Sequence, residues 1–372
     1  MLNVLNGYLI TSSYISESSR CYDYFMFLVC FGTRPELIKL YPIIEEFKNK
    51  KIPFKTLFTG QHKDLITQFI NLSGRPSFTL TDIMKHNQSL NSLLSKMLTK
   101  SDPILKKNNF KIIVQGDALS SFAMALSAFN NKRDVIHLEA GLRTNDMFSP
   151  FPEEANRIMI SHLSNIHFCP TKRSMENLSK EGIKNNIYLV GNTIVDSFSL
   201  ITNKFKISEK ILKTVDKNPN YILVTLHRRE NRDKNFSSIW RQLNNFSKDL
   251  NIIYLKHPSV KNVNEKLNKN IKILNPVNYP DMLYLINNSS GIISDSGGLQ
   301  EEVVCADKKI LICRDSTERP ETIELGYGKL IGTDIENNIN FLFKNRNSNK
   351  VKNPYGVNVA NKIVKRLEKI YL

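Results

Sequence analysis

From Met26 onward the chain alternates short apolar runs with longer segments whose apolar residues recur at helical spacing. The run MFLVCFG at 26–32 predicts a strand. Residues 35–50 then predict a helix, because apolar side chains recur three and four positions apart and Pro35 suits the first helical turn. The same alternation continues through strand-like runs at 54–60, 111–117, 134–141, 165–171 and 186–192. Strands that alternate with helices predict a parallel sheet with helices on both faces.

The alternation begins again after about residue 191, as expected when a chain of this length forms two domains. The second set of strand-like runs lies at 221–227, 251–257, 271–276, 291–296 and 308–314. We therefore predict an α/β fold of two doubly wound domains, 26–190 and 191–355, that face a central cleft. Residues 356–372 predict an amphipathic helix that crosses back to the first domain.

The first 25 residues are polar and rich in Ser and Tyr. They lack the basic start and the sustained apolar centre of a signal peptide. We interpret residues 1–25 as an N-terminal extension, either disordered or the product of a mis-assigned start, with Met26 opening the first domain. Nowhere does the sequence contain about 18 consecutive apolar residues, so no membrane partner is predicted.

The chain holds 52 Lys and Arg against 35 Asp and Glu, a net charge of +17. Such a charge suits a nucleic-acid-binding protein. The basic residues are nevertheless scattered and interleaved with Asn, and no block of five occurs. We interpret them as a solvated surface that helps to attract an anionic substrate, and we predict no nucleic-acid partner.

The five cysteines are odd in number and form no CxxC pair. This usage predicts free thiols in a reducing, cytoplasmic compartment, and the Cys and His spacings suit no metal site. The cysteines are Cys21, Cys30, Cys169, Cys305 and Cys313.

Two glycine turns at strand ends are candidate anion sites, since ligands bind at the carboxyl ends of parallel strands. Gly32 leads into a helix whose N-terminus offers backbone N–H groups, and Arg34 and Lys39 follow it. At the second turn, Ser296, Gly297 and Gly298 precede another helix, with Glu302 placed for a ribose diol and Arg319 adding positive charge. An ordinary capped helix remains the alternative at each turn. The residues involved are Gly32, Arg34, Lys39, Ser296, Gly297, Gly298, Glu302 and Arg319.

Acidic residues gather at the strand ends of the first domain, where carboxylates can act as general acids and bases. His227 ends the first strand of the second domain and faces them across the predicted cleft. Helix caps and salt bridges are the alternative roles of such acids. The acidic residues are Asp117, Glu139, Glu153 and Glu154.

No GxGxxG, GxxxxGK[ST] or GxSxG motif is present in a suitable context. The sequence therefore indicates neither a dinucleotide cofactor nor a P-loop nor a hydrolase elbow, and we predict no cofactor.

Nine segments occur in an order that resembles the non-hydrolysing UDP-N-acetylglucosamine 2-epimerases, from Met26 to the C-terminus. They are FGTRPELIK, TGQH, QGD, HLEAGLRT, PFPEEANR, GNTIVDS, HRREN, DSGGLQEE and RDSTERPE. The resemblance implies Rossmann-like domains in a GT-B-like fold and a homodimer. It also implies reversible epimerisation at C2 of UDP-N-acetylglucosamine, through elimination of UDP, a 2-acetamidoglucal intermediate and re-addition.

The same resemblance implies roles for individual residues. Arg34 and Lys39 match the cationic pair at the diphosphate and the catalytic cleft. Ser296, Gly297 and Gly298 match a phosphate-binding turn, Glu302 a ribose ligand and Arg319 a further nucleotide-site cation. The residues that match the catalytic groups are Asp117, Glu139, Glu153, His227 and Lys39.

Four other functions remain as alternatives. A hydrolysing 2-epimerase would release N-acetylmannosamine and UDP, and a related 2-epimerase would act on another UDP-2-acetamido sugar. A GT-B glycosyltransferase would need an acceptor site for which no motif is visible. A basic nucleic-acid-binding protein rests on the net charge alone.

The chain departs from this family where many members bind a second UDP-N-acetylglucosamine as activator. Asp64 replaces a Gln, Asn87 replaces an Arg, and LKHPSV replaces PVHxNP. We therefore predict that the rate depends hyperbolically on substrate concentration, with no activator requirement. Initial rates over a wide range of UDP-N-acetylglucosamine concentrations test this, and a strongly sigmoidal curve would contradict it.

Overall fold

The computed structural model describes residues 25–61, 74–85, 87–227, 231, 235–256, 268–344 and 353–372. All but the last residue of the predicted extension lies outside these ranges, as do Cys21 and Asp64.

A parallel sheet in the order β3-β2-β1-β4-β5-β6-β7 forms the first half of the molecule. The interior strand β1 is apolar throughout, as expected of a strand that has a neighbour on each side and helices on both faces. The strands are β1 (Met26–Phe31), β2 (Phe54–Phe58), β3 (Phe78–Thr79), β4 (Phe110–Gln115), β5 (Val135–Leu138), β6 (Ile166–Cys169) and β7 (Ile187–Leu189).

Helices cover both faces of this sheet. One face packs in a single apolar cluster with α1 and the C-terminal helix α14, and the other packs with α3, α4 and α5. The helices are α1 (Arg34–Asn49), α3 (Leu90–Lys107), α4 (Leu119–Asn130), α5 (Glu153–Leu163), α6 (Lys172–Lys180) and α14 (Val359–Tyr371).

A second parallel sheet, in the order β10-β9-β8-β11-β12-β13, forms the other half. Its strands are β8 (Ile222–Leu226), β9 (Ile252–Lys256), β10 (Ile271–Leu274), β11 (Gly291–Ser294), β12 (Ile310–Ile312) and β13 (Gly328–Leu330). One of its faces packs with α7, α8, α11 and α12, and the other with α10 and the short helix η1. These helices, with α13, are α7 (Ile194–Lys204), α8 (Glu209–Lys217), α10 (Phe236–Phe246), α11 (Tyr279–Asn288), α12 (Gly297–Cys305), α13 (Pro320–Glu324) and η1 (Ile339–Phe341).

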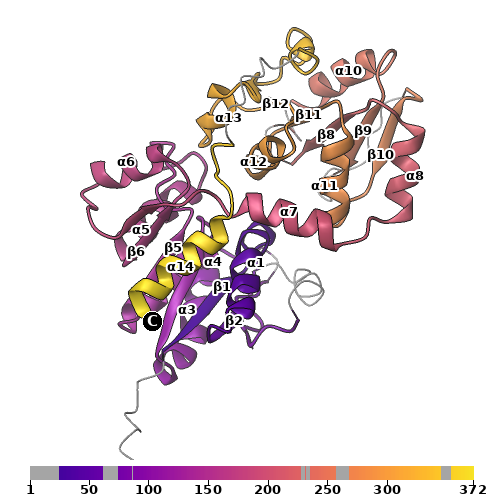
Figure 1. Ribbon diagram of the computed structural model, residues 1–372. Coiled ribbons are helices and arrows are strands. Elements are labelled where there is room, and N and C mark those ends of the chain that lie inside the picture. Colours follow the sequence, from indigo (N-terminus) through magenta and orange to yellow (C-terminus); the bar gives the residue numbers. More distant parts are fainter. Residues whose placement is uncertain are drawn as a thin grey trace, which may run out of the picture.

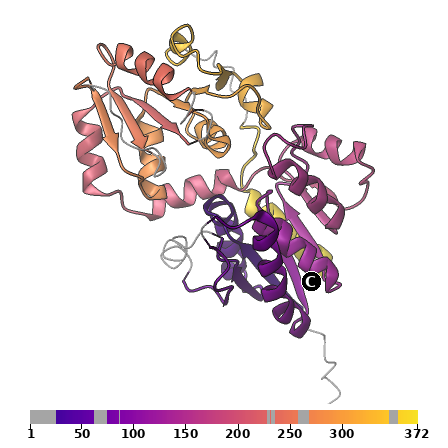
Figure 2. The ribbon, with the colours of Figure 1, turned by 180° about the vertical axis from the view of Figure 1, so that it is seen from behind.

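The last helix returns to the first sheet after the chain has completed the second (Figures 1 and 2). Its buried face, with Ile363 and Leu367, joins the cluster that contains Phe27 of β1. Lys50 Nζ also lies 2.6 Å from Glu368 Oε2 of α14. Residues at the two ends of the chain therefore share one core.

The predicted α/β class and the strands proposed from the apolar runs are confirmed. Two strands were not predicted. β3 spans two residues, too short for a periodic signal, and β13 reads GKL, which lacks an apolar pattern. Both lie at sheet edges, where pairing with the neighbouring strand decides the conformation.

The four cysteines in the described ranges are unpaired, and three of them are buried. Burial raises the pKa of the Cys305 thiol to about 12. None of the helices in these ranges has the length and apolar character that a membrane span requires.

Leu367 provides a test of the contribution of α14 to stability. Its side chain is fully buried, so Leu367→Ala should lower the free energy of unfolding by about 2–5 kcal/mol. Ile370→Ala on the same helix removes a side chain that is 40% exposed and should change it by at most about 0.5 kcal/mol. Urea unfolding of both variants measures the difference, and equal effects would show that α14 does not anchor the core.

Candidate active site

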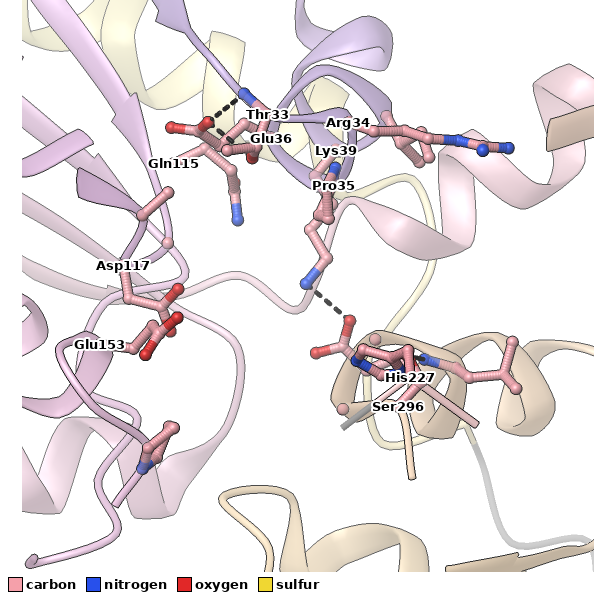
Figure 3. Close-up of a pocket in the computed structure, with 18 of the residues that line it drawn as sticks. Thr33, Arg34, Pro35, Glu36, Lys39, Gln115, Asp117, Glu153, His227 and Ser296 are labelled. Carbon is pink, nitrogen blue, oxygen red and sulfur yellow. Dashed lines mark hydrogen bonds and ion pairs between the residues drawn. The ribbon is translucent and has the colours of Figure 1, made fainter. Parts of the chain in front are cut away.

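A cleft of about 830 Å³ lies between the carboxyl ends of the two sheets. In Figure 3, Asp117 and Glu153 lie together on one side, His227 and Ser296 lie on the other, and Lys39 points into the space between. Of the candidate site residues, Gly32 and Glu154 do not line the cleft. The other eleven line it: Arg34, Lys39, Asp117, Glu139, Glu153, His227, Ser296, Gly297, Gly298, Glu302 and Arg319.

The turn from β1 into α1 is occupied by a side chain of its own. The N–H groups of Gly32 and Thr33 donate to Glu36 Oε2 at 3.0 and 2.7 Å. Ser120 and Ser121 of α4 donate to the same buried carboxylate. The prediction that this turn offers free N–H groups to an anion is therefore wrong, because an internal carboxylate has taken that position. A Cβ on Gly32 would lie 2.1 Å from Thr59 Oγ1, so the glycine serves close packing.

Arg34, next in the chain, reaches across to the second half of the molecule. Its guanidinium donates to the Val277 carbonyl at 3.4 Å and lies 5.7 Å from the centroid of the Tyr279 ring. Burial lowers the pKa of Arg34, with Glu302 and Tyr279 opposing the change. Within the described ranges no carboxylate forms an ion pair with Arg34, so its charge is available to an anionic ligand.

Lys39, one turn further along α1, joins two carboxylates from different halves of the molecule. Its Nζ forms a short contact with Glu139 and lies 2.6 Å from Glu301 Oε2. Burial by itself would lower the pKa of Lys39, but the two carboxylates outweigh burial and raise it. Lys39 is therefore a charged partner of acids rather than a free phosphate ligand.

Glu139 follows β5 with a left-handed backbone, at φ 61°. A non-glycine residue held in this region carries a conformational cost that the surrounding contacts must offset. Its side chain is 6% exposed and accepts hydrogen bonds from Lys39, from Gln115 at 2.8 Å and from Asn192 at 3.3 Å. The turn and these three donors thus hold the Glu139 carboxylate, which lines the cleft, in one orientation.

The acids on the other wall differ in their surroundings. Asp117 Oδ2 accepts from Arg157 Nε at 2.8 Å, and Asn156 donates to the Asp117 carbonyl. Glu153 opens α5 and lines the cleft. Glu154 is fully buried, accepts from Arg157 and from two backbone N–H groups, and does not line the cleft. Of the two adjacent glutamates, Glu153 therefore faces the ligand space and Glu154 is structural.

His227 follows β8, and its imidazole is oriented by a buried acid. Its Nδ1 lies 2.7 Å from Asp295 Oδ1, and its backbone N–H donates to the same carboxylate. The His227 side chain remains 42% exposed, and the residue lines the cleft.

The N-terminus of α12 lines the cleft from the second half of the molecule. Ser296 caps the helix by accepting from the Leu299 N–H, and the first-turn N–H groups have no acceptor within the helix. A Cβ on Gly297 would lie 2.6 Å from Glu318 Oε1, whereas a Cβ on Gly298 would meet no atom within 4 Å. Gly297 thus allows close packing, and Gly298 leaves the backbone open to a ligand.

Glu302, in the second turn of α12, faces the cleft beside Tyr279, which donates to it at 2.8 Å. Burial raises the pKa of Glu302 to about 7, while Tyr279 and Arg34 oppose the change. This carboxyl can accept hydrogen bonds from a diol, in keeping with the role implied by the resemblance.

Arg319 lies at the junction of the two halves, among three carboxylates. It contacts Glu318, donates to Glu301 at 2.7 Å and reaches Glu139 at 3.5 Å. Burial would lower the pKa of Arg319, but the three acids raise it well above its ordinary value. Its charge is thus largely neutralised by the protein itself.

Several site residues were not singled out from the sequence. Arg157 lies three and four positions after Glu154 and Glu153, a spacing that signals an ion pair on a helix. Glu301 lies next to Glu302 in an otherwise largely apolar helix, and a second acid at that position was the sequence signal for a site residue. The residues are Gln115, Arg157, Asn192, Glu301 and Glu318. No group of three or more metal-ligating side chains was found in the described part of the chain.

Two Rossmann-like domains, with a helix N-terminus on one side of a shared cleft and carboxylates on the other, define a protein of the GT-B-like class. A family model described as UDP-N-acetylglucosamine 2-epimerase matches residues 45–368. The chain belongs to this family.

Its relatives resemble it over most of their length. The UDP-N-acetylglucosamine 2-epimerase of Campylobacter jejuni is 38% identical over 88% of this chain and 93% of the relative. The crystal structure of the Neisseria meningitidis enzyme bound to UDP-GlcNAc has a TM-score of 0.83 and 34% identity, covering 92% of this chain and 100% of that one. The Methanocaldococcus jannaschii enzyme in complex with UDP-GlcNAc and UDP has a TM-score of 0.80 and 35% identity, covering 93% and 100%.

The raised pKa of Glu302 predicts how stability depends on pH. Between about pH 4.5, its ordinary value, and about pH 7, the unfolded chain releases a proton that the folded protein retains, so stability falls as pH rises through this window. Glu302→Gln keeps an acceptor for Tyr279 and removes this cost. The variant should gain relative to the wild type as pH rises, by at most about 3 kcal/mol above pH 7.

Urea unfolding of both proteins between pH 4.5 and 8 measures this difference. Glu324→Gln, at a side chain that is 61% exposed, is the control and should follow the wild type at every pH. A constant difference between Glu302→Gln and the wild type over this range would refute the assignment.

Proposed function

We propose that the protein interconverts UDP-N-acetylglucosamine and UDP-N-acetylmannosamine by inverting C2, without net hydrolysis. The observation that carries the proposal is the division of the cleft, in which carboxylates of the first half face the α12 N-terminus of the second (Figure 3). The named activity of the relatives and the UDP-GlcNAc bound in two related structures support the choice of substrate.

The first step is an elimination across C1 and C2. A carboxylate removes the C2 proton, the C1–O bond breaks, and its electron pair leaves with UDP, which leaves 2-acetamidoglucal. The C2 proton is only weakly acidic, but the C1–O bond breaks as it is removed, so no free carbanion forms at C2. The route therefore needs no redox cofactor. Arg34 and the backbone N–H groups of Gly297 and Gly298, at the start of α12, stabilise the charge that develops on the departing diphosphate.

The second step reverses the first on the other face of the sugar. A proton reaches C2 from the opposite side while the UDP oxygen attacks C1, and atoms and charge balance over the cycle. Inversion therefore requires proton-transfer groups on two sides of the ring. We assign these to Glu139 and to the neighbouring Asp117 and Glu153, with His227 completing the site near Ser296.

The remaining assignments follow from how the cations are held. Lys39 acts through Glu139, with which it is ion-paired. Arg319 contributes to the nucleotide side mainly as part of the charged cluster, because three acids surround it. Glu302 binds the ribose diol. Closure of the cleft around the intermediate retains UDP and excludes water, which distinguishes epimerisation from hydrolysis.

We further propose a homodimer in the cytoplasm that supplies a precursor for polysaccharide synthesis. The homodimer follows from the resemblance to the epimerase family. The unpaired cysteines are compatible with a reducing compartment.

Incubation with UDP-N-acetylglucosamine in deuterated water, followed by NMR, tests the reaction. Deuterium at C2 of intact UDP-N-acetylmannosamine is expected. Accumulation of free UDP and N-acetylmannosamine would instead identify a hydrolysing enzyme. Exchange confined to a different UDP-sugar would show that the enzyme is specific for that sugar. No exchange with any of these sugars would refute the proposal.

Amide variants test the acid–base assignment. Asp117→Asn, Glu139→Gln and Glu153→Gln should each lower the exchange rate by about 100-fold or more, since general acid–base groups contribute on this scale. UDP binding should persist, because the proposal assigns the diphosphate to Arg34 and the α12 N-terminus rather than to these acids. Glu209→Gln, at an exposed carboxylate outside the cleft, is the control. Normal turnover in all three site variants would contradict the assignment.

A further inference from the structure

Glu139 has a partner acid that the proposed mechanism does not use. Glu301 lies on α12 and is 1% exposed, although a carboxylate buried to this degree requires strong compensation. Its Oε1 accepts from Arg319 at 2.7 Å and from Asn192 at 3.1 Å, and its Oε2 lies 2.6 Å from Lys39 Nζ.

The same three side chains also contact Glu139. Lys39 forms an ion pair with it, Asn192 donates to it at 3.3 Å, and Arg319 reaches it at 3.5 Å. Glu139 and Glu301 therefore form a carboxylate pair, one from each half of the molecule, that shares one ammonium, one guanidinium and one amide.

The two acids of this pair face two cations, Lys39 and Arg319. Arg319 is shared with a third acid, Glu318, which Arg314 also pairs. Other groups face the pair from its surroundings: Gln115 of β4 donates to Glu139, Glu318 contacts Arg319, and Glu302 follows Glu301 on α12. Loss of Glu301 would leave Glu139 between Lys39 and Arg319, an arrangement that favours the charged form of a carboxyl group.

We propose that Glu301 is a positioning residue for the reaction: by sharing Lys39, Arg319 and Asn192 with Glu139, it sets the charge state in which Glu139 meets C2 of the sugar. This inference rests on the proposed function for its catalytic meaning. Glu301 lies on α12, the helix whose N-terminus is proposed to bind the diphosphate. The same helix therefore carries the leaving-group site and the residue that positions Glu139.

Two variants with opposite expected effects test the proposal. Glu301→Gln removes one negative charge, so the titration of Glu139 should move to lower pH by about one unit or more. Asn192→Asp adds a carboxylate beside the same pair, so the titration should move to higher pH by about one unit. Glu154→Gln is the matched control, since Glu154 is a buried, arginine-paired carboxylate that shares none of these donors, and it should leave the titration unchanged.

The titration is read by 13C NMR of protein labelled at the glutamate side-chain carboxyl carbon. The Glu139 resonance is the one lost in Glu139→Gln. The same shifts should appear in the limb of the pH–rate profile that disappears in that variant. In Glu301→Gln, kcat should fall by about tenfold or more through misplacement of Lys39 and Glu139, while the affinity for UDP stays within about twofold.

Opposite shifts in the two variants, with Glu154→Gln unchanged, would support the proposal. An unmoved Glu139 titration in Glu301→Gln, or shifts of the same sign in both variants, would overturn it. If Glu301→Gln does not fold, Asn192→Asp decides alone, and absence of an upward shift refutes the coupling. The NMR titration needs no substrate, so a wild type that exchanges no C2 proton would refute the proposed function while the coupling is still measured.

Discussion

The charged cluster at the junction of the two domains is the constraint on which the site depends. Buried charges persist only when paired and hydrogen-bonded, and here charged side chains of one half pair with those of the other. Lys39 from α1 meets Glu301 from α12, and Arg319 reaches Glu139 at the end of β5. The relative position of the two sheets is therefore tied to the arrangement of the acids that line the cleft.

A similar internal compensation explains why one of two helix N-termini is available to a ligand. At α1, Glu36 takes the N–H groups of Gly32 and Thr33 and also holds the first turn of α4 through Ser120 and Ser121. That turn is rigid and internally satisfied. At α12, a serine cap and the unobstructed Gly298 leave the backbone accessible. The two glycine turns resemble each other in sequence, but a carboxylate of the protein fills the first and the second stays open.

The cations of the cleft also differ in whether carboxylates of the protein pair with them. Three positive side chains were expected to meet the diphosphate, but Lys39 and Arg319 are already paired with carboxylates. Arg34 contacts a carbonyl and an aromatic ring instead. Arg34 and the α12 dipole therefore provide the positive field in the cleft that no carboxylate among the described residues already pairs, whereas the other two cations are paired with acids.

The apolar periodicity alone determined the α/β class, the two sheets and nearly all of the strands, because buried parallel strands and amphipathic helices leave local, periodic patterns. The motif residues also pointed to one cleft, since strand ends converge in space. Only the tertiary structure decided that Glu153 faces the cleft while Glu154 is buried, that Glu36 fills the first turn, and that Glu301 pairs with Glu139. Some of these contacts join residues far apart in the chain, and others depend on the direction in which a single side chain points. No local sequence pattern predicts either.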